Sequence, residues 1–166
     1  MSNPGVRAEY QQAVSAYVAA GGDESVQQVI TAIYQVTKKL DQWYDRQLAD
    51  LGITHGDWSV LAYLAKQEDA PATPSALADA AGLAASSMTS RLDRMCAMGL
   101  VTREPDATKR TRVLVRLTDA GWDIFAQAVR EANVVESDTL AALTTAQRAD
   151  LAALLELVIS GLDASG

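Results

Sequence analysis

Residues 91–116, RLDRMCAMGLVTREPDATKRTRVLVR, change from one periodicity to another within a few residues. Up to Gly99 the apolar residues recur at three- and four-residue steps, which is typical of a helix. After Gly99 two runs, 100–104 and 111–117, have the β-type pattern, and apolar residues alternate with polar ones most clearly in the second. Between the runs, PDATKR supplies turn residues. The stretch therefore predicts a helix followed directly by a β-hairpin whose tip carries cations.

The same stretch concentrates positive charge. It holds seven of the chain's 14 Lys and Arg residues and three acidic residues, so its net charge is +4, whereas the whole chain carries −7 and the remainder −11. A local excess of this sign indicates either a surface for a polyanion or an ordinary solvated charged face. Charge alone leaves both readings open.

The segment before the hairpin predicts two short helices joined by a turn. Thr73 is placed to cap the first helix, and Pro74 takes the first helical position, where its missing N–H costs nothing. The second helix runs from about residue 84 to residue 98. Its inward-facing residues are Met88, Leu92 and Met95. This order predicts a helix-turn-helix, and the basic hairpin makes it a winged helix.

Further helices are predicted on both sides of the winged helix. A short amphipathic helix fits residues 8–20, and an apolar stripe over 26–51 predicts a helix about 39 Å long, more than a small domain covers by itself. Asp23 or Ser25 can cap this long helix, and Thr118 can cap another. Capping boxes are predicted at Thr54 with Asp57 and at Thr144 with Gln147.

These elements predict a mainly α fold with a small β-hairpin wing, in which a winged helix-turn-helix lobe is joined to further helices. The expected parts are an N-terminal extension with a short amphipathic helix at 1–22, a helical region at 23–52 and 118–166, and the winged helix-turn-helix lobe at 53–117.

Catalysis has little support in the composition. One histidine, His55, is too few for an all-protein zinc cage, and one cysteine, Cys96, excludes an internal disulfide framework and fits a reducing cytoplasm. No phosphate-binding glycine motif, zinc-protease motif or nucleophile elbow is present. No apolar run approaches the ~20 residues that cross a bilayer, and the N-terminus has no signal pattern. We expect a cytoplasmic protein that is not an enzyme, with no cofactor, metal site or membrane partner.

The order of these signals resembles the multiple antibiotic resistance regulator (MarR) family. The resemblance covers roughly residues 25–162 and is most specific in LADAAGLAASSMTSRLDRMCAMGLVTREPDATKRTRVLVRLTDAG. It implies a homodimer in which the family's first, fifth and sixth helices interlock and two winged helices enter successive major grooves of double-stranded DNA. On this basis 23–52 and 118–166 form the helical dimerisation region and 53–117 the DNA-binding lobe. The amphipathic extension at 1–22 is expected to cross onto the second subunit of the dimer. It also implies a small aromatic or acidic effector that lowers DNA affinity.

Carried over by position, the resemblance and the chemistry of DNA recognition give a set of candidate contacts. Hydroxyls near a helix start bond phosphates or base edges, and arginine reads guanine with two donors. The DNA-binding candidates are Ser75, Ser86, Ser87, Thr89, Ser90, Arg91, Arg94, Lys109, Arg110 and Arg112. For Arg94, a structural ion pair with Asp93 or Glu104 is as well supported as a DNA contact. Arg116 is expected to be solvated.

The wing departs from the family pattern, which usually carries Asp-x-Arg at its tip. This chain has Lys109 and Thr111 at those positions, and a lysine cannot accept the hydrogen bonds of an arginine. Either the wing is shifted, with Asp106 supplying the carboxylate, or its tip is looser than usual. The sequence leaves open whether Arg110 or Arg112 enters the minor groove.

An aromatic concentration gives the candidate effector-binding residues. They are Tyr34, Trp43, Tyr44, His55 and Trp58. The alternative is that helix-spaced aromatics form core or dimer interface, and that His55 is a surface residue. Cys96 is expected to pack rather than to react, because a helix C-terminus disfavours a thiolate.

The leading hypothesis is a ligand-responsive transcriptional regulator, a repressor of a pseudo-palindromic operator. A protein-interaction module that uses its winged helix without specific DNA binding is the alternative. A small hydrolase or transferase using His55 is a remote third reading, because no nucleophile or metal cluster accompanies the histidine.

Overall fold

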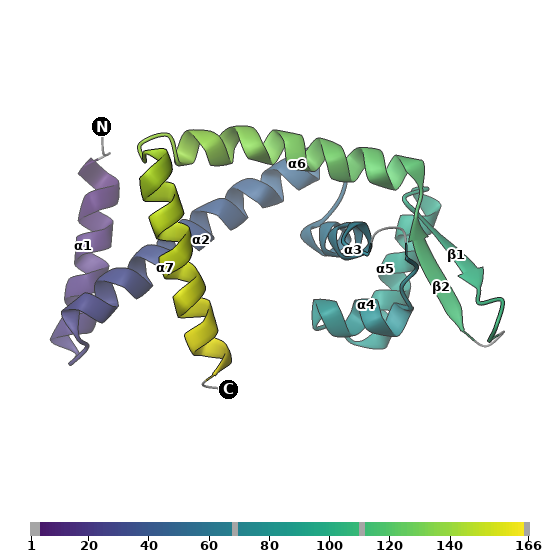
Figure 1. The fold of residues 1–166 in the computed structure, drawn as a ribbon, viewed down its shortest axis with the longest axis horizontal. Helices are drawn as coiled ribbons and strands as arrows, with labels where there is room; N and C mark the ends of the chain where they lie inside the picture. Colours follow the sequence, from purple (N-terminus) through teal and green to yellow (C-terminus); the bar gives the residue numbers. More distant parts are fainter. Residues whose placement is uncertain (1–3, 68–69, 110–111, 165–166) are drawn as a thin grey trace. The chain divides into compact units, whose positions relative to one another are not determined.

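The computed structural model describes residues 4–67, 70–109 and 112–164. Within them the chain forms helices and one two-stranded sheet (Figure 1), which confirms the mainly α fold with a β-hairpin wing. The elements are α1 (Pro4–Ala19), α2 (Glu24–Asp50), α3 (His55–Ala65), α4 (Pro74–Ala81), α5 (Ala85–Ala97), β1 (Val101–Pro105), β2 (Val113–Leu117), α6 (Asp119–Thr139) and α7 (Thr145–Asp163). They fall into two compact units, Met1–Val60 and Leu61–Gly166.

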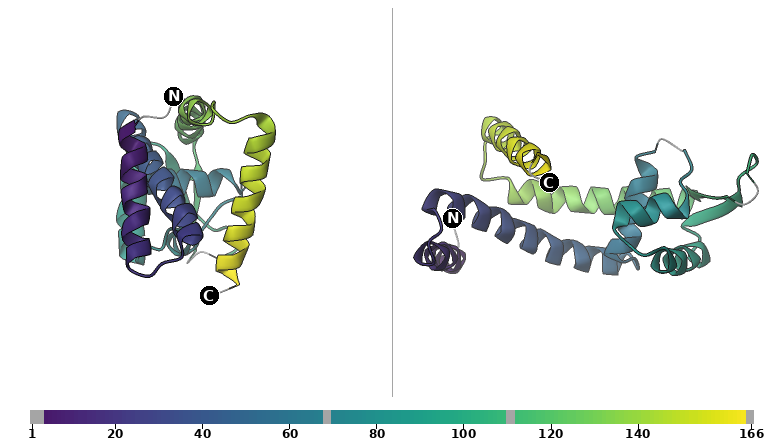
Figure 2. Two further views of the ribbon diagram at one scale, coloured as in Figure 1. Left: turned by 90° about the vertical axis from the view of Figure 1, so that its left-hand side faces the viewer. Right: turned by 90° about the horizontal axis from the view of Figure 1, so that it is seen from below.

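In the first unit α1 packs against α2 (Figure 2). Val14 is buried, and the Tyr10 hydroxyl donates a hydrogen bond to the backbone oxygen of Gln28 at 2.9 Å. Thus α1 lies on the long helix of its own chain, and it begins four residues earlier than the predicted 8–20, at Pro4, a residue suited to a first helical turn.

The 27-residue helix α2 begins and ends with standard caps. Of the two predicted capping residues, Asp23 is the one used, accepting from the Val26 amide, and Gly52 follows the helix with a φ of +73°. Thr54 and Asp57 then cap α3 reciprocally: the Thr54 amide donates to the Asp57 carboxylate at 2.9 Å, and the Asp57 amide donates to the Thr54 hydroxyl at 3.3 Å. The predicted capping box at the start of α3 is confirmed.

In the second unit α4, α5 and the hairpin enclose an apolar core. Thr73 accepts from the Ala76 amide and Pro74 takes the first helical position, as predicted, and Gly82 ends α4 in the left-handed conformation. The core residues are each at most 1% exposed; they are Leu77, Met88, Leu92, Met95 and Val115. The three residues predicted to face inward from α5 are therefore among the most buried in the chain.

The hairpin is antiparallel, with Val101 opposite Leu117 and Arg103 opposite Val115. Ala72 joins the outer side of β2 through two backbone hydrogen bonds with Val115, at 3.1 and 2.8 Å. The strands are Val101–Pro105 and Val113–Leu117, whereas the sequence predicted 100–104 and 111–117, and Arg110 and Thr111 lie outside the described residues. Paired on both sides at Val115, β2 gives the wing a firm base.

The start of α6 is tied to the corner between α5 and β1. The Thr118 hydroxyl accepts from the Gly121 amide at 3.0 Å and donates to the Gly99 carbonyl at 2.6 Å. A Cβ at Gly121 would stand 2.1 Å from the Leu100 carbonyl oxygen, so only glycine fits there. Farther on, the Thr144–Gln147 capping box of α7 is confirmed.

Candidate nucleic-acid interface

Helix α5 presents one apolar and one hydroxyl-rich face. Met88, Leu92 and Met95 point into the core, whereas the four predicted hydroxyl residues are all exposed: Ser86, Ser87, Thr89 and Ser90. The Thr89 hydroxyl donates to the Ala85 carbonyl at 2.9 Å and the Ser90 hydroxyl to the Ser86 carbonyl at 3.2 Å. Each hydroxyl oxygen keeps acceptor capacity toward solvent, and a small rotation frees its proton for an outside acceptor.

The N-terminal end of α5 has no side-chain cap. Its N-cap residue is Ala84, which cannot accept the first amides of the helix. These amides and the hydroxyls of Ser86 and Ser87 therefore share one exposed helix end, an arrangement suited to phosphate oxygens. Ser75, at the start of α4, is also exposed, and its hydroxyl lies 3.1 Å from that of Thr73.

The two arginines of α5 differ in exposure: Arg91 is half-buried and Arg94 is exposed. Asp93, which the sequence offered as an ion-pair partner for Arg94, pairs with Arg103 of β1 at 2.6 Å. A second Arg103 nitrogen donates to the Thr89 carbonyl at 2.9 Å. Sequence reasoning missed Arg103, although alternation along β1 places it on the same face as buried Val101, toward α5.

The wing is organised by Asp106. One carboxylate oxygen accepts from the amide and the hydroxyl of Thr108, at 2.8 and 2.7 Å, and the other lies 3.7 Å from an Arg112 nitrogen. The hydroxyl and amide of Thr108, and then the amide of Lys109 and the charge of Arg112, lower the pKa of Asp106 below its usual value. Of the two alternatives from the sequence, this geometry favours the shifted wing with Asp106 as the carboxylate.

The basic residues of the wing face solvent where they are described. Lys109 and Arg112 are exposed, and the Asp106 amide donates to the Arg112 carbonyl at 2.8 Å, which closes the base of the wing loop. Arg110 lies outside the described residues. Arg112 is therefore the wing arginine for which the structure gives a partner, and that partner holds its guanidinium beside the loop.

The candidate effector residues lie in the first unit and form smaller groups. Trp43 and Tyr44 meet edge to face, with ring centroids 5.4 Å apart, and His55 Nδ1 lies 3.9 Å from the Asp45 carboxylate, both side chains exposed. Trp58 is half-buried. Tyr34 is exposed in a groove between α1 and α2, about 13 Å before Trp43 along the helix. The structure thus groups Trp43 with Tyr44 and His55 with Asp45, and sets Tyr34 apart.

Comparisons with known proteins identify this architecture. A family model described as MarR family matches residues 51–110, the segment that holds α3, α4, α5, β1 and part of the wing. The transcriptional regulator PecS of Dickeya dadantii is 30% identical over 129 residues, covering 76% of this chain and 77% of PecS. This chain belongs to the MarR family.

Solved structures agree with this assignment. Wild-type MarR from E. coli in its apo form is 29% identical, with a TM-score of 0.67, over 76% of this chain and 93% of MarR. A mutant MarR complexed with operator DNA is 27% identical, with a TM-score of 0.64, over 82% of this chain and 99% of that one. MepR from S. aureus shows the same fold. It is 22% identical, with a TM-score of 0.68, over 79% of this chain and 96% of MepR.

Membership of the MarR family makes the chain a winged helix-turn-helix transcriptional regulator and not an enzyme. Within the described ranges, no three His, Cys, Asp or Glu side chains are grouped so that they could hold a metal ion. Across residues 4–67, 70–109 and 112–164, no helix combines the length and the apolar character that crossing a membrane requires.

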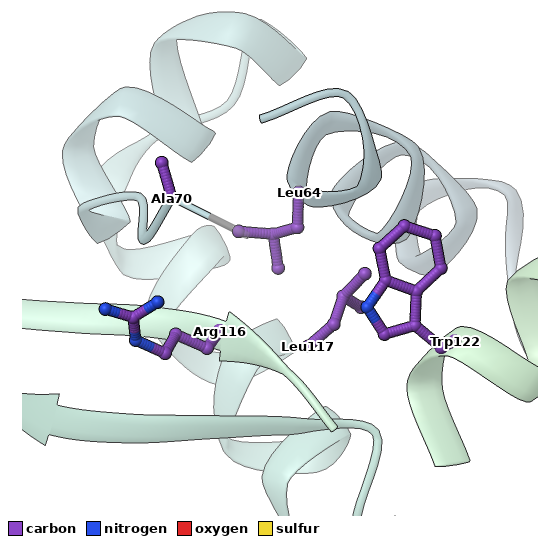
Figure 3. A pocket seen from close by; sticks show the side chains of 5 residues that line it. All are labelled: Leu64, Ala70, Arg116, Leu117 and Trp122. Carbon is purple, nitrogen blue, oxygen red and sulfur yellow. The ribbon is translucent and has the colours of Figure 1, made fainter. Parts of the chain in front are cut away.

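A small cavity of this MarR-family lobe lies between the hairpin and the start of α6 (Figure 3). It is lined by Leu64, Ala70, Arg116, Leu117 and Trp122 and has a volume of about 80 Å³. Ligand sites for drug-sized molecules are several times larger, about 300–1,000 Å³. The cavity is too small for an aromatic effector.

Proposed function

We propose that this MarR-family regulator is a homodimeric, ligand-responsive repressor that binds a pseudo-palindromic operator in double-stranded DNA. The observation that carries the proposal is that the exposed hydroxyl face of α5 lies in the same unit as the exposed wing cations Lys109 and Arg112, the second of which faces Asp106. A helix of α5's size fits the major groove, and a hairpin that carries arginine fits the adjacent minor groove.

The proposed roles follow from chemistry and position. Ser86, Ser87 and Ser90, in the N-terminal half of α5, bond base edges and phosphates, because specific contacts come mainly from that half of a recognition helix. Arg112, oriented by Asp106, enters the minor groove, with Lys109 and Arg110 beside it. Ser75, Thr89, Arg91 and Arg94 add contacts around the groove. The solved complex of a mutant E. coli MarR with operator DNA supports this reading.

The homodimer is supported by the surface of α7. In the described part of the chain no residue of this helix is buried, although it carries an apolar stripe that includes Leu151, Leu154 and Leu162, exposed by 41–70%. Exposed apolar area of this size marks an interface. A second copy that covers it would set two wings about one DNA turn, ~34 Å, apart, so the operator would mirror the two-fold symmetry.

The domain roles and the effector complete the proposal. Residues 23–52 and 118–166 serve dimerisation, 53–117 bind DNA, and 1–22 extend the interface. The proposed effector is a small aromatic or acidic molecule that contacts the Trp43–Tyr44 pair or His55, whose imidazole faces the Asp45 carboxylate. As a regulator of transcription with one unpaired cysteine, Cys96, the protein acts in the cytoplasm.

The test is a titration of the protein against labelled duplex from upstream of its own gene, with a scrambled duplex as competitor, at several salt concentrations. We expect preference for the upstream duplex and a steep salt slope. Arg112→Ala should weaken binding and lower the slope by about one unit. Arg130→Ala, which removes one exposed charge from α6, is the matched control and should change neither.

If the protein binds both duplexes equally weakly, the next experiment is a selection of binding sequences from random duplexes. A selected sequence that binds with the same Arg112 dependence supports the proposal. If no sequence is enriched and the protein instead binds a protein partner stably and stoichiometrically, the repressor proposal is wrong. The protein-interaction module is then the better hypothesis.

A further inference from the structure

Arg103 connects the wing to the recognition helix at two points. One guanidinium nitrogen lies 2.6 Å from the Asp93 carboxylate, and a second donates to the Thr89 carbonyl at 2.9 Å. Asp93 and Thr89 stand one turn apart on α5, so the guanidinium spans a turn of the helix. We call these three residues the Arg103 clamp.

The two ends of the clamp differ in how firmly they are held. Arg103 is paired across the hairpin with Val115, which is fully buried and also bonded to Ala72. Its side chain is 27% exposed, whereas that of Asp93 is 64% exposed. A fixed strand therefore holds the outer side of α5 through a planar fork that allows little rotation.

The position of the clamp matters for DNA because of what lies beside it. The carbonyl that Arg103 bonds belongs to Thr89, next to Ser90 and three residues after Ser86 on the hydroxyl face. The angle between α5 and the hairpin sets whether the hydroxyls and Arg112 can reach neighbouring grooves together.

We propose that Arg103 is a positioning residue for DNA recognition, which fixes α5 relative to the wing through Asp93 and the Thr89 carbonyl. This inference rests on the proposed function. Arg103 does not itself bond DNA, because its two terminal nitrogens donate to α5 and its Nε is buried. Its effect on affinity passes through the geometry of other residues.

The clamp and plain electrostatics make opposite predictions for one substitution. Asp93 is an exposed carboxylate on a surface that meets phosphates, so by charge alone Asp93→Asn should tighten binding to any DNA. If Asp93 orients α5 through Arg103, the same change should weaken binding to the operator. The sign of the effect therefore separates the two accounts.

The experiment compares wild type, Asp93→Asn, Arg103→Gln and the double variant for binding to operator and to scrambled duplex over a range of salt. We expect about a tenfold loss of operator affinity for each single variant and little further loss for the double, because both remove the same contact. The salt slope should stay at the wild-type value. Asp123→Asn, an exposed carboxylate on α6, is the matched control and should not lose operator affinity.

Arg103→Lys keeps the charge and loses the planar fork, so it should bind the operator more weakly than wild type even if Arg103→Gln fails to fold. The clamp is overturned if Asp93→Asn binds the operator as tightly as wild type or tighter. It is also overturned if Arg103→Gln lowers the salt slope by about one unit, since that marks a direct phosphate contact. Loss of operator preference in the wild type would overturn the proposed function itself, and the clamp with it.

Discussion

The winged-helix segment and α7 use similar apolar residues with opposite results. In α4, α5 and β2, side chains such as Leu77, Leu92 and Val115 are at most 1% exposed, whereas the leucines of α7 are exposed by as much as 70%. Both segments have good caps, at Thr73 and at Thr144. The difference lies in packing and not in local helix signals.

The contrast shows which part of the chain can stabilise itself. A helix is held in a protein mainly by burial of its apolar face, and α5 has that burial within its own unit. The stripe on α7 has no such cover in the single chain. We infer that α4, α5 and the hairpin form a self-sufficient core, whereas α7 depends on a second copy.

The largest effect is expected from deleting a buried leucine of α5. Leu92→Ala leaves a cavity in a site with 0% exposure, so we expect the free energy of unfolding to fall by about 2–5 kcal/mol. Leu157→Ala makes the same chemical change on exposed α7 and should alter unfolding of the lobe by less than about 0.5 kcal/mol. Urea unfolding followed by tryptophan fluorescence measures both. Equal losses for the two variants would remove the distinction between the regions.

The next effect concerns the dimer. Leu154→Glu with Leu162→Glu places two charges on the apolar stripe of α7, and we expect the dimer dissociation constant to rise by about 100-fold or more because an interface must desolvate them. Analytical ultracentrifugation over a dilution series measures this. Ser160→Glu puts a charge on the opposite side of the same helix and is the control. A dimer unchanged by the double substitution would place the interface elsewhere.

A smaller effect is expected where α6 meets the end of α5. Gly121→Ala must move the Leu100 carbonyl, which stands 2.1 Å from the added Cβ, so we expect a loss of about 1–3 kcal/mol in thermal or urea unfolding. Ala120→Ser adds one atom to the exposed neighbouring residue and should be close to neutral. If Gly121→Ala matched wild type in stability, the close approach of α6 to this corner would be refuted.

The smallest effect is a pH dependence of the wing. In the folded protein the pKa of Asp106 is lowered from its ordinary value of 3.8. The ionised Asp106 therefore contributes its full stabilisation above pH 3.8, and this contribution is lost as the pH falls through the lowered folded-state pKa. The difference in unfolding free energy between wild type and Asp106→Asn should be constant from pH 8 to 5 and shrink below pH 4. A difference that grows on acidification would contradict the arrangement with Thr108 and Arg112.

Local signals predicted most of the fold, because caps and periodicity depend on nearby residues. The Thr73, Thr118 and Thr144 caps and the inward face of α5 follow from spacings of three or four residues. The Arg103 clamp was missed, since it joins residues 10 and 14 positions apart whose partners depend on how β1 lies against α5. The need for glycine at Gly121 likewise appears only once Leu100 is placed beside it.

For the candidate DNA-binding surface, the sequence predicted which types of residue take part but not how they contact one another. The family pattern placed the hydroxyls and the basic wing, but the choice of carboxylate at the wing depended on loop geometry, where Thr108 bends the chain so that Asp106 faces Arg112. The candidate effector residues were chosen by type, and the structure separates Tyr34 from Trp43 along α2.

Because α6 is attached at Gly99 and Leu100, a rotation of this helix is transmitted directly to the end of α5. Its first turn is bonded to the corner that ends α5, through the Thr118 hydroxyl and amide, and it has no flexible hinge there. A 21-residue helix is about 32 Å long, so a shift of about 3 Å at its far end turns the corner by about 5°. Over the length of α5 this rotation moves the hydroxyl end by about 2 Å, enough to break a hydrogen bond to a base. If α5 binds DNA as proposed, we therefore expect a modest displacement at the remote end of α6 to weaken operator binding.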